Sequence, residues 1–377
     1  MSKPLRENKK RGFLSRLFRA IILLGLIAVL VYFFVLNDEQ RKKLNNIQKN
    51  NIDFKEIAAP KLKIIDESSK TRPITVVYDN NVDAWPHAGL SKAYAIYEFP
   101  VEGGESRVLG FFKDVKDLQV GPVRSARHYF LDYVLEHDSI FAHLGKSPKA
   151  AADMPGLRIS NINGQSYDTQ SPKSNSKREY WRSSNKYTPH NAYTNIENLL
   201  NISKEKEYKL ETDTKVPFRY SVRNIELDKN KSKKISSVEG AYHIGNKTVF
   251  TYNDETKKYT KTSKGILQKD ENTNENLELK NIIILKTDVT VLQDGEHKDR
   301  KNVRTTGKLE GIYSTNGRVM DIVAEKDTRS SKTIFKDKDG NEIALNDGIT
   351  FIMIVPESNI SYDYTVIEEV ETTSNEN

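Results

Sequence analysis

Cysteine is absent from this chain of 377 residues. Its absence excludes disulfides, thiolate metal sites, a cysteine nucleophile and a lipid-modified cysteine. The fold must therefore be stabilised by its hydrophobic core alone, and the length is sufficient for such a core in two domains.

Several motifs that mark cofactors and catalysis are also missing. The chain has no G-x-S-x-G, no P-loop, no dinucleotide-binding glycine motif and no zinc spacing such as H-E-x-x-H. The sequence therefore predicts no cofactor and no metal site.

Positive charge is concentrated at one end of the chain. The formal net charge is +7, but the first twenty residues hold seven Lys and Arg against a single Glu, so the remainder is close to neutral. No basic stripe with interleaved aromatic residues occurs elsewhere, so nucleic acid is not expected as a partner.

The longest apolar run extends from Ala20 to Leu36. A membrane-spanning helix needs about 20 such residues, and Arg19 can snorkel to the interface. The basic residues of segment 1–19 predict a cytoplasmic N-terminus and an extracytoplasmic remainder. A cleaved signal peptide is the alternative, but Asn-Asp-Glu-Gln after Leu36 offers no small-x-small cleavage site. A buried core helix is disfavoured because aliphatic residues cover every face.

Composition divides the rest of the chain into four segments. Residues 37–70 are polar and are interpreted as a stalk or linker. Residues 71–203 mix strand and helix patterns, which predicts an α/β domain, and residues 216–362 alternate short apolar runs with turns, which predicts a mostly antiparallel β domain. The acidic tail at 363–377 is expected to be disordered.

Within the first domain, β-branched and apolar runs predict strands, and helical spacing predicts helices. A turn at residues 102–105 is expected to join two strands as a hairpin. The predicted strands are 74–79, 93–99, 107–112 and 139–144; the predicted helices are 125–137, one starting at Ser147-Pro148, and 189–200; residues 163–187 are predicted as a long surface loop. In the second domain, Gly317, Gly340 and Gly348 are expected at hairpin tips.

The densest group of unusual residues is Gly121-Pro122-Val123-Arg124-Ser125-Ala126-Arg127. If this turn leads directly into a helix, the free N–H groups of its first turn and the two arginines form an anion site. The alternative is that both arginines pair with internal carboxylates while Ser125 only caps the helix. The predicted ligand-binding set comprises Arg124, Ser125, Arg127, Arg107 and Asn191.

Histidines and carboxylates of the first domain are the candidates for acid–base chemistry. His143 ends a predicted strand and His190 lies in a Thr-Pro-His-Asn loop, positions from which functional side chains often project; the alternative is a structural role in hydrogen bonding. Asp79, Glu98 and Glu102 lie at strand ends or in the hairpin. Two of them could form an acid–base pair, or they could be the internal partners of the arginines.

The stretches that carry these residues resemble the YerB-like family of bacterial envelope proteins. The resemblance covers about residues 71–357 and implies a two-domain protein of the envelope with no established reaction. Family members typically carry a lipid-modified cysteine, which this chain lacks, and an acidic residue where this chain has Tyr94. The resemblance rests on RPITVVYDN, GLSKAYAIYEFPVEGGESRVLGFF, GPVRSARHYFLDYVLEHDSIFAHLGKSP and YWRSSNKYTPHNAYT, and in the second half on FTYNDETKKY, NIIIL and FKDKDGNEIALNDGITFIMIVP.

Three functions follow from these features. The first is a membrane-anchored module that binds cell-wall polymer, or scaffolds wall-synthesis proteins, through an anion-binding cleft. The second is a hydrolase or transferase acting on wall glycan or peptide. The third is assembly of a membrane complex through the transmembrane helix, for which Gly25 and Ala28 provide only a weak small-residue face.

Overall fold

The computed structural model describes residues 61–167, 179–295, 298–358 and 360–368, together with Leu24, Glu39, Gln40 and Lys42. Residues 1–61 and 62–377 are separate compact units. Among the described residues, no helix is both long enough and apolar enough to cross a membrane. Apart from Leu24, the predicted anchor at 20–36 lies outside the described residues, as do most of the predicted stalk and the end of the acidic tail.

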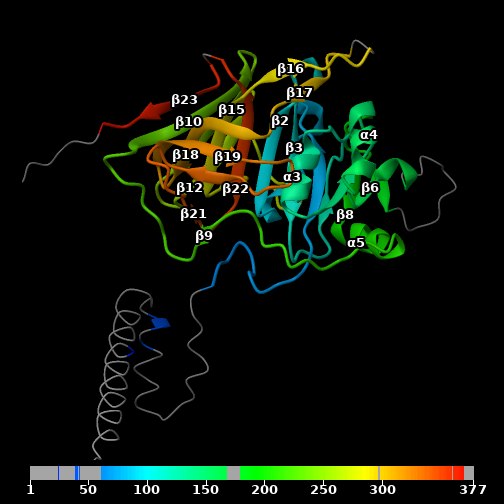
Figure 1. The fold of residues 1–377 in the computed structure, drawn as a ribbon, viewed down its shortest axis with the longest axis horizontal. Coiled ribbons are helices and arrows are strands. Elements are labelled where there is room, and N and C mark those ends of the chain that lie inside the picture. The colour runs from blue at the N-terminus through cyan, green and yellow to red at the C-terminus, as the bar shows by residue number, and fades with distance from the viewer. Residues whose placement is uncertain are drawn as a thin grey trace, which may run out of the picture. The chain divides into compact units, whose positions relative to one another are not determined.

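One mixed sheet organises the described part of residues 62–377, in the order β13-β12-β11-β10-β19-β18-β15-β22-β2-β3-β1-β5-β6, with β14, β20 and β23 attached to its side. Figure 1 shows the strands of the first half at one end of this sheet and those of the second half at the other. The strands of the first half are β1 (Ile74–Asp79), β2 (Ala95–Pro100), β3 (Ser106–Phe112), β5 (Ile140–His143) and β6 (Asn161–Asn163). Those of the second half are β10 (Lys233–His243), β11 (Asn246–Asn253), β12 (Lys258–Ser263), β13 (Ile266–Leu267), β14 (Glu278–Leu279), β15 (Asn281–Thr287), β18 (Gly307–Thr315), β19 (Arg318–Lys326), β20 (Ile334–Lys336), β22 (Thr350–Pro356) and β23 (Tyr362–Val366).

Smaller elements lie at the edges of this sheet. A three-stranded sheet, in the order β4-β8-β7, carries part of the candidate site. Its strands are β4 (Gln119–Val120), β7 (Tyr180–Arg182) and β8 (Ala192–Asn195); the remaining short strands are β9 (Tyr220–Ser221), β16 (Val289–Val291), β17 (Lys301–Val303) and β21 (Leu345–Asn346), and the 3-10 turns are η3 (Val82–Ala84), η4 (Leu90–Lys92), η5 (Glu102–Gly104) and η6 (Gly164–Ser166).

The pairing of β2 with β22 joins the two predicted domains. The two strands run parallel, with Ile96 opposite Phe351, and β22 also runs parallel to β15. The two predicted segments therefore share one continuous sheet, and the second half is not purely antiparallel. The predicted hairpin is confirmed, because β2 and β3 pair antiparallel around η5.

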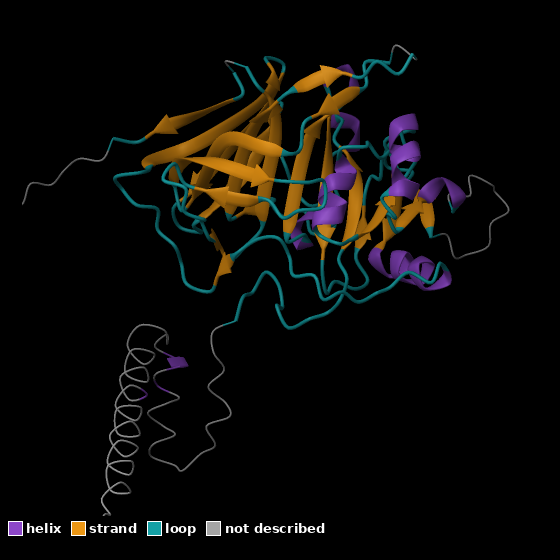
Figure 2. Ribbon diagram, in the orientation of Figure 1, coloured by secondary structure: helices purple, strands orange, loops and turns teal. Residues whose placement is uncertain are grey.

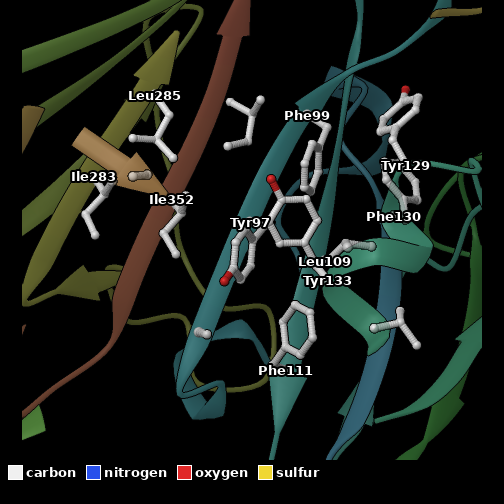
Figure 3. Close-up of a cluster of buried hydrophobic side chains, with 14 of the residues drawn as sticks. Tyr97, Phe99, Leu109, Phe111, Tyr129, Phe130, Tyr133, Ile283, Leu285 and Ile352 are labelled. Atoms are coloured by element: carbon white, nitrogen blue, oxygen red, sulfur yellow. The ribbon is translucent and has the colours of Figure 1, made fainter. Parts of the chain in front are cut away.

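The central strands are buried on both faces, which explains why their sequences are almost continuously apolar. Successive side chains point to opposite faces, so Val77 belongs to one hydrophobic cluster and Val76 to the other. Figure 3 shows the first cluster, in which the aromatic residues of β2 and β3 pack beside Ile283, Leu285 and Ile352 of the second half. The core thus crosses the β2–β22 junction without a break.

Three helices pack around the strands of the first half (Figure 2). They are α3 (Phe130–Glu136), α4 (Pro148–Gly156) and α5 (Ile196–Glu205). The predicted start of α4 is confirmed, because Ser147 caps it by accepting a hydrogen bond from the backbone N–H of Ala150, and Pro148 is its first residue. Two other predicted starts were wrong: α3 begins at Phe130 instead of 125, and α5 begins at Ile196 after a strand that the sequence did not indicate.

Both ends of the folded unit are more ordered than predicted. The last residues of the predicted stalk pack on the core, with the backbone N–H groups of Lys63 and Ile64 donating to the carboxylate of Asp347. The expected disordered tail begins with strand β23, which pairs with β10. In the predicted loop 163–187, strand β7 pairs with β8.

Candidate functional site

The segment Gly121–Arg127 is extended, not the start of a helix. The backbone N–H of Asp79 donates to the carbonyl of Pro122 (2.9 Å), and that of Arg124 donates to the carbonyl of Val77 (2.9 Å). On its other side, the N–H of Val123 donates to the carbonyl of Ala192 (2.6 Å). The carbonyls of Arg124 and Ala126, which would accept the first bonds of a helix starting at 125, accept instead from the N–H groups of Leu144 (2.9 Å) and Ser147 (3.1 Å). No helix starts here, and the helix-dipole argument for an anion site fails. The pairing with β1 places Arg124 beside the end of that strand.

Arg124 and His190 meet at one carboxylate. The Nε atom of Arg124 lies 2.8 Å from Oδ2 of Asp79, and Nδ1 of His190 lies 2.7 Å from the same oxygen. The exposed fraction of the side chain is 7 % for Asp79, 25 % for Arg124 and 18 % for His190. The carboxylate is thus buried beneath two groups that reach the surface, and we call these three residues the Asp79 cluster.

The two outer groups of the Asp79 cluster keep unused hydrogen-bonding capacity. A carboxylate can only accept, so Nδ1 of His190 donates to Asp79, and Nε2 is the nitrogen that holds the lone pair in the neutral ring. Within the described residues, Nε2 has no hydrogen-bond partner, and neither of the terminal amino groups of Arg124 has one. The Arg124 Nε contact is itself an ion pair without an aligned hydrogen bond. This arrangement offers two terminal amino groups of a guanidinium and one imidazole nitrogen to a ligand.

Arg127, like Arg124, has an internal carboxylate as its partner. Its Nε and terminal nitrogen each lie 2.7 Å from one oxygen of Glu102, a bidentate pair. Burial acts to raise the pKa of Glu102, but the hydrogen bond and charge of Arg127 outweigh it, and the pKa is lowered. Ser125 is not a helix cap, because its hydroxyl donates to the carbonyl of Leu144 (2.8 Å). Neither Glu102 nor Ser125 is therefore available to a ligand.

Arg107 lies close to the other two arginines. Its terminal nitrogen donates to the carbonyl of Ser125 (2.5 Å). Burial and the charge of Arg127 lower the pKa of Arg107 to about 9, with Arg124 adding to the effect and Glu102 opposing it. Three guanidinium groups thus share two carboxylates, Asp79 and Glu102. The group carries excess positive charge, which an anion would neutralise.

Three predicted residues lie away from the open site. Glu98 is sealed, with an exposed fraction of 1 %, and pairs with Lys261 of the second half (3.0 Å). His143 is fully buried and bonds the carbonyl of Gly145 through Nδ1 (2.8 Å), and burial lowers its pKa to about 4. Asn191 donates to the carbonyl of Ser183 (3.0 Å) and so shapes the loop that carries His190. These residues support the structure of the site without facing a ligand.

The matches with known proteins agree with this organisation. Residues 61–209 match the model described as "Protein of unknown function (DUF3048) N-terminal domain", and residues 238–352 match the corresponding C-terminal domain. The chain belongs to the DUF3048 family. The three residues of the Asp79 cluster all lie in the N-terminal DUF3048 segment.

A member of this family from Bacillus subtilis (strain 168), "Putative lipoprotein YerB", is 28% identical over 331 residues, which cover 87% of this chain and 93% of the relative. The crystal structure of YerB protein from Bacillus subtilis matches with a TM-score of 0.69 and 26% identity, covering 81% of this chain and 99% of that one. The resemblance seen in the sequence is confirmed.

Sequence reasoning missed one group of this DUF3048 site. Lys186 holds the His190 loop by donating to the carbonyls of Ala84 (2.9 Å) and Pro86 (2.7 Å) and to the carboxylate of Glu271 (2.8 Å). Glu271 belongs to the second half and also accepts from the hydroxyl of Tyr193 (2.6 Å). No local pattern marks these contacts, because the partners lie 85 and 78 residues apart in the chain.

Two cavities lie elsewhere and do not include the Asp79 cluster. One, of about 500 Å³, is lined by residues such as His128, Asp132 and Arg329. The guanidinium of Arg329 donates to the carboxylate of Asp132, and the ring of His128 bonds the side-chain oxygen of Asn302. The other, of about 400 Å³, lies beside Ile65 and Phe218. Within the described ranges, no group of His, Asp and Glu side chains is arranged to hold a metal ion.

Proposed function

We propose that this protein is held in the membrane by residues 20–36 and that its folded part binds an acidic polymer of the cell envelope at the Asp79 cluster. The observation that carries the proposal is the pair of terminal amino groups on Arg124, which have no partner among the described residues although Asp79 fixes the side chain. A guanidinium held in this way is suited to a phosphate or carboxylate group, because less side-chain entropy is lost on binding.

The local charge supports an anionic ligand. Arg107, Arg124 and Arg127 face only two carboxylates, and the repulsion between the arginines contributes to the low pKa of Arg107. An anion bound at Arg124 would offset this repulsion. The adjacent imidazole of His190 could add a further hydrogen bond or charge.

Two facts support the proposed location. The relative carries the word lipoprotein in its name, and the chain has an apolar run at 20–36 where a lipid-modified cysteine would otherwise provide the anchor. If this run spans the bilayer as proposed, protease added to cells stripped of their wall should remove the folded part while leaving residues 1–19 protected. Complete protection of the chain would contradict the proposed topology.

The binding test uses the full-length protein in detergent and poly(glycerol phosphate) as the probe. We expect the polymer to retain the protein, retention to weaken as salt rises, and Arg124→Gln to abolish most of it. The matched control is Arg223→Gln, which removes the same charge at an exposed position of the second half. Equal retention of the Arg124 and Arg223 variants at every salt concentration would show that the polymer does not bind at the Asp79 cluster.

A further inference from the structure

We propose that the Asp79 cluster hydrolyses a phosphodiester, with His190 as general base for a water molecule and Arg124 as the phosphate-binding group. This inference rests on the proposed function, because it requires an anionic ligand at Arg124. It adds a reaction and a substrate class to binding.

The contact between His190 and Asp79 sets the imidazole for proton transfer. Because Nδ1 donates to a carboxylate oxygen at 2.7 Å, the ring orientation is fixed and the basic nitrogen is Nε2. Asp79 is nearly buried and holds the ring in this orientation, with Nε2 directed away from the carboxylate. An oriented imidazole above a buried carboxylate is the arrangement that general-base catalysis requires.

Oδ2 of Asp79 holds Arg124 next to the imidazole of His190. Its Nε and Nδ1 of His190 both contact Oδ2 of Asp79, at 2.8 and 2.7 Å, so the guanidinium and the imidazole are neighbours. The unpartnered terminal amino groups of Arg124 can hold two non-bridging oxygens of a phosphate. The negative charge on these oxygens is redistributed as the phosphorus is attacked. A preorganised guanidinium stabilises the charge distribution of the transition state.

The other hydrolytic reactions lack a required group here. Glycoside hydrolysis uses two carboxyl groups that flank the bond, but Glu102 is held by Arg127, Glu98 is sealed with Lys261, and both oxygens of Asp79 accept protein hydrogen bonds. Acyl transfer by a serine needs a hydroxyl bonded to the base, and no hydroxyl of the described residues bonds to His190, while that of Ser125 bonds to Leu144. Water is therefore the nucleophile, and the substrate supplies the negative charge.

The proposed step is balanced without a further reactant. The oxygen of water attacks phosphorus while one of its protons moves to Nε2 of His190. The bond from phosphorus to the departing alkoxide oxygen then breaks, and that oxygen receives the proton from the imidazolium. The products are a phosphomonoester and an alcohol, and the enzyme returns to its starting state.

The experiment measures turnover and binding on the same full-length preparations. Bis(4-nitrophenyl) phosphate reports turnover, and two further arms, poly(glycerol phosphate) and vesicles of phosphatidylglycerol, distinguish a polymer from a lipid headgroup as the source of the phosphodiester. We expect His190→Gln to lower kcat by about 100-fold or more and to weaken poly(glycerol phosphate) retention much less than Arg124→Gln does. Arg124→Gln should lose both, and His243→Gln, an exposed histidine of the second half, should lose neither.

The outcomes separate the two proposals. Binding without turnover in every arm would overturn hydrolysis and leave the proposed binding function in place. Equal polymer retention by the Arg124→Gln and Arg223→Gln variants would overturn both proposals. Turnover that His190→Gln does not reduce would also overturn the inference, because the activity would then arise from another group or a contaminant. The inference would be supported if turnover required one group in its basic form and if His190→Gln removed that turnover.

Discussion

The Asp79 cluster and the pair formed by Glu136 and Lys326 both join a carboxylate to a cationic side chain. They differ in whether hydrogen-bond donors of the cation are left without a partner. Glu136 and Lys326 have side-chain exposed fractions of 0 and 2 %, and their charged atoms lie 2.7 Å apart. The carboxylate also accepts from the backbone N–H of Thr333 (2.6 Å), and the ammonium also donates to the carbonyl of Ser331. The Asp79 cluster is partly exposed and retains free donors. Satisfied, sealed ions indicate a structural role, whereas fixed ions with free donors at the surface indicate a ligand site.

The largest expected effect tests the sealed side of this comparison. Lys326→Met leaves the charge of Glu136 buried without its cation, which should lower the free energy of unfolding by about 3–5 kcal/mol. Urea unfolding followed by tryptophan fluorescence would measure it. The double variant Lys326→Met/Glu136→Leu should recover most of the loss, because it removes the unpaired charge as well. A single variant as stable as the wild type would show that this pair is not the structural element its burial indicates.

A second sealed group should make stability sensitive to acid. The pKa of His143 is lowered from 6.5 to about 4 by burial. Between these pH values the unfolded chain binds a proton that the folded protein does not. The contribution of His143 to the free energy of unfolding is therefore fully present above pH 6.5 and is lost as the pH falls toward 4. In His143→Gln the slope of unfolding free energy against pH in this window should be smaller by up to about 1.4 kcal/mol per pH unit. An unchanged slope would mean that the folded protein protonates His143.

An intermediate case lies between the sealed pairs and the open cluster. The side chain of Lys186 is 7 % exposed and that of its partner Glu271 is 23 % exposed. Lys186→Met removes a charged donor from two backbone carbonyls and from Glu271, so we expect a loss of about 2 kcal/mol in unfolding free energy. Because Lys186 holds the loop of His190, polymer retention should also weaken. Loss of stability with unchanged retention would show that the loop keeps its position without this anchor.

Local sequence patterns predicted the elements of this fold better than the contacts between them. The strand at 74–79 and the helix that starts at Ser147-Pro148 were predictable because β-branched runs and caps act within a few residues. The start of α3 was not, because the carbonyls of Arg124 and Ala126 accept hydrogen bonds from Leu144 and Ser147, which lie beyond α3 in the chain. A helix-like spacing of apolar residues cannot reveal that competition.

The same distinction applies to the candidate site. Asp79, Arg124 and His190 were identified individually from their positions at a strand end, in a turn and in a loop. Which arginine meets which carboxylate could not be predicted, because Asp79 and His190 are 111 residues apart and Glu98 finds its cation in the second half. Pairing of ions depends on tertiary structure, so the sequence left both alternatives open. In the structure each of the two arginines has an internal carboxylate partner, Asp79 for Arg124 and Glu102 for Arg127.

The smallest expected change in stability belongs to Arg124, the residue on which the proposed binding depends most. In Arg124→Gln, Asp79 keeps His190 and the backbone N–H of Asn81 as donors, so its charge is not left without a partner. The substitution also removes a like charge from beside Arg107, whose pKa is lowered in part by Arg124. We therefore expect the unfolding free energy to change by less than about 1 kcal/mol, measured by urea unfolding on the preparation used for polymer retention. A loss of the size expected for Lys326→Met would place Arg124 among the structural ions. Near-neutral stability together with lost retention would instead support a guanidinium held in place for a ligand, since removing one partner of a sealed ion pair leaves a buried charge uncompensated at a much larger cost.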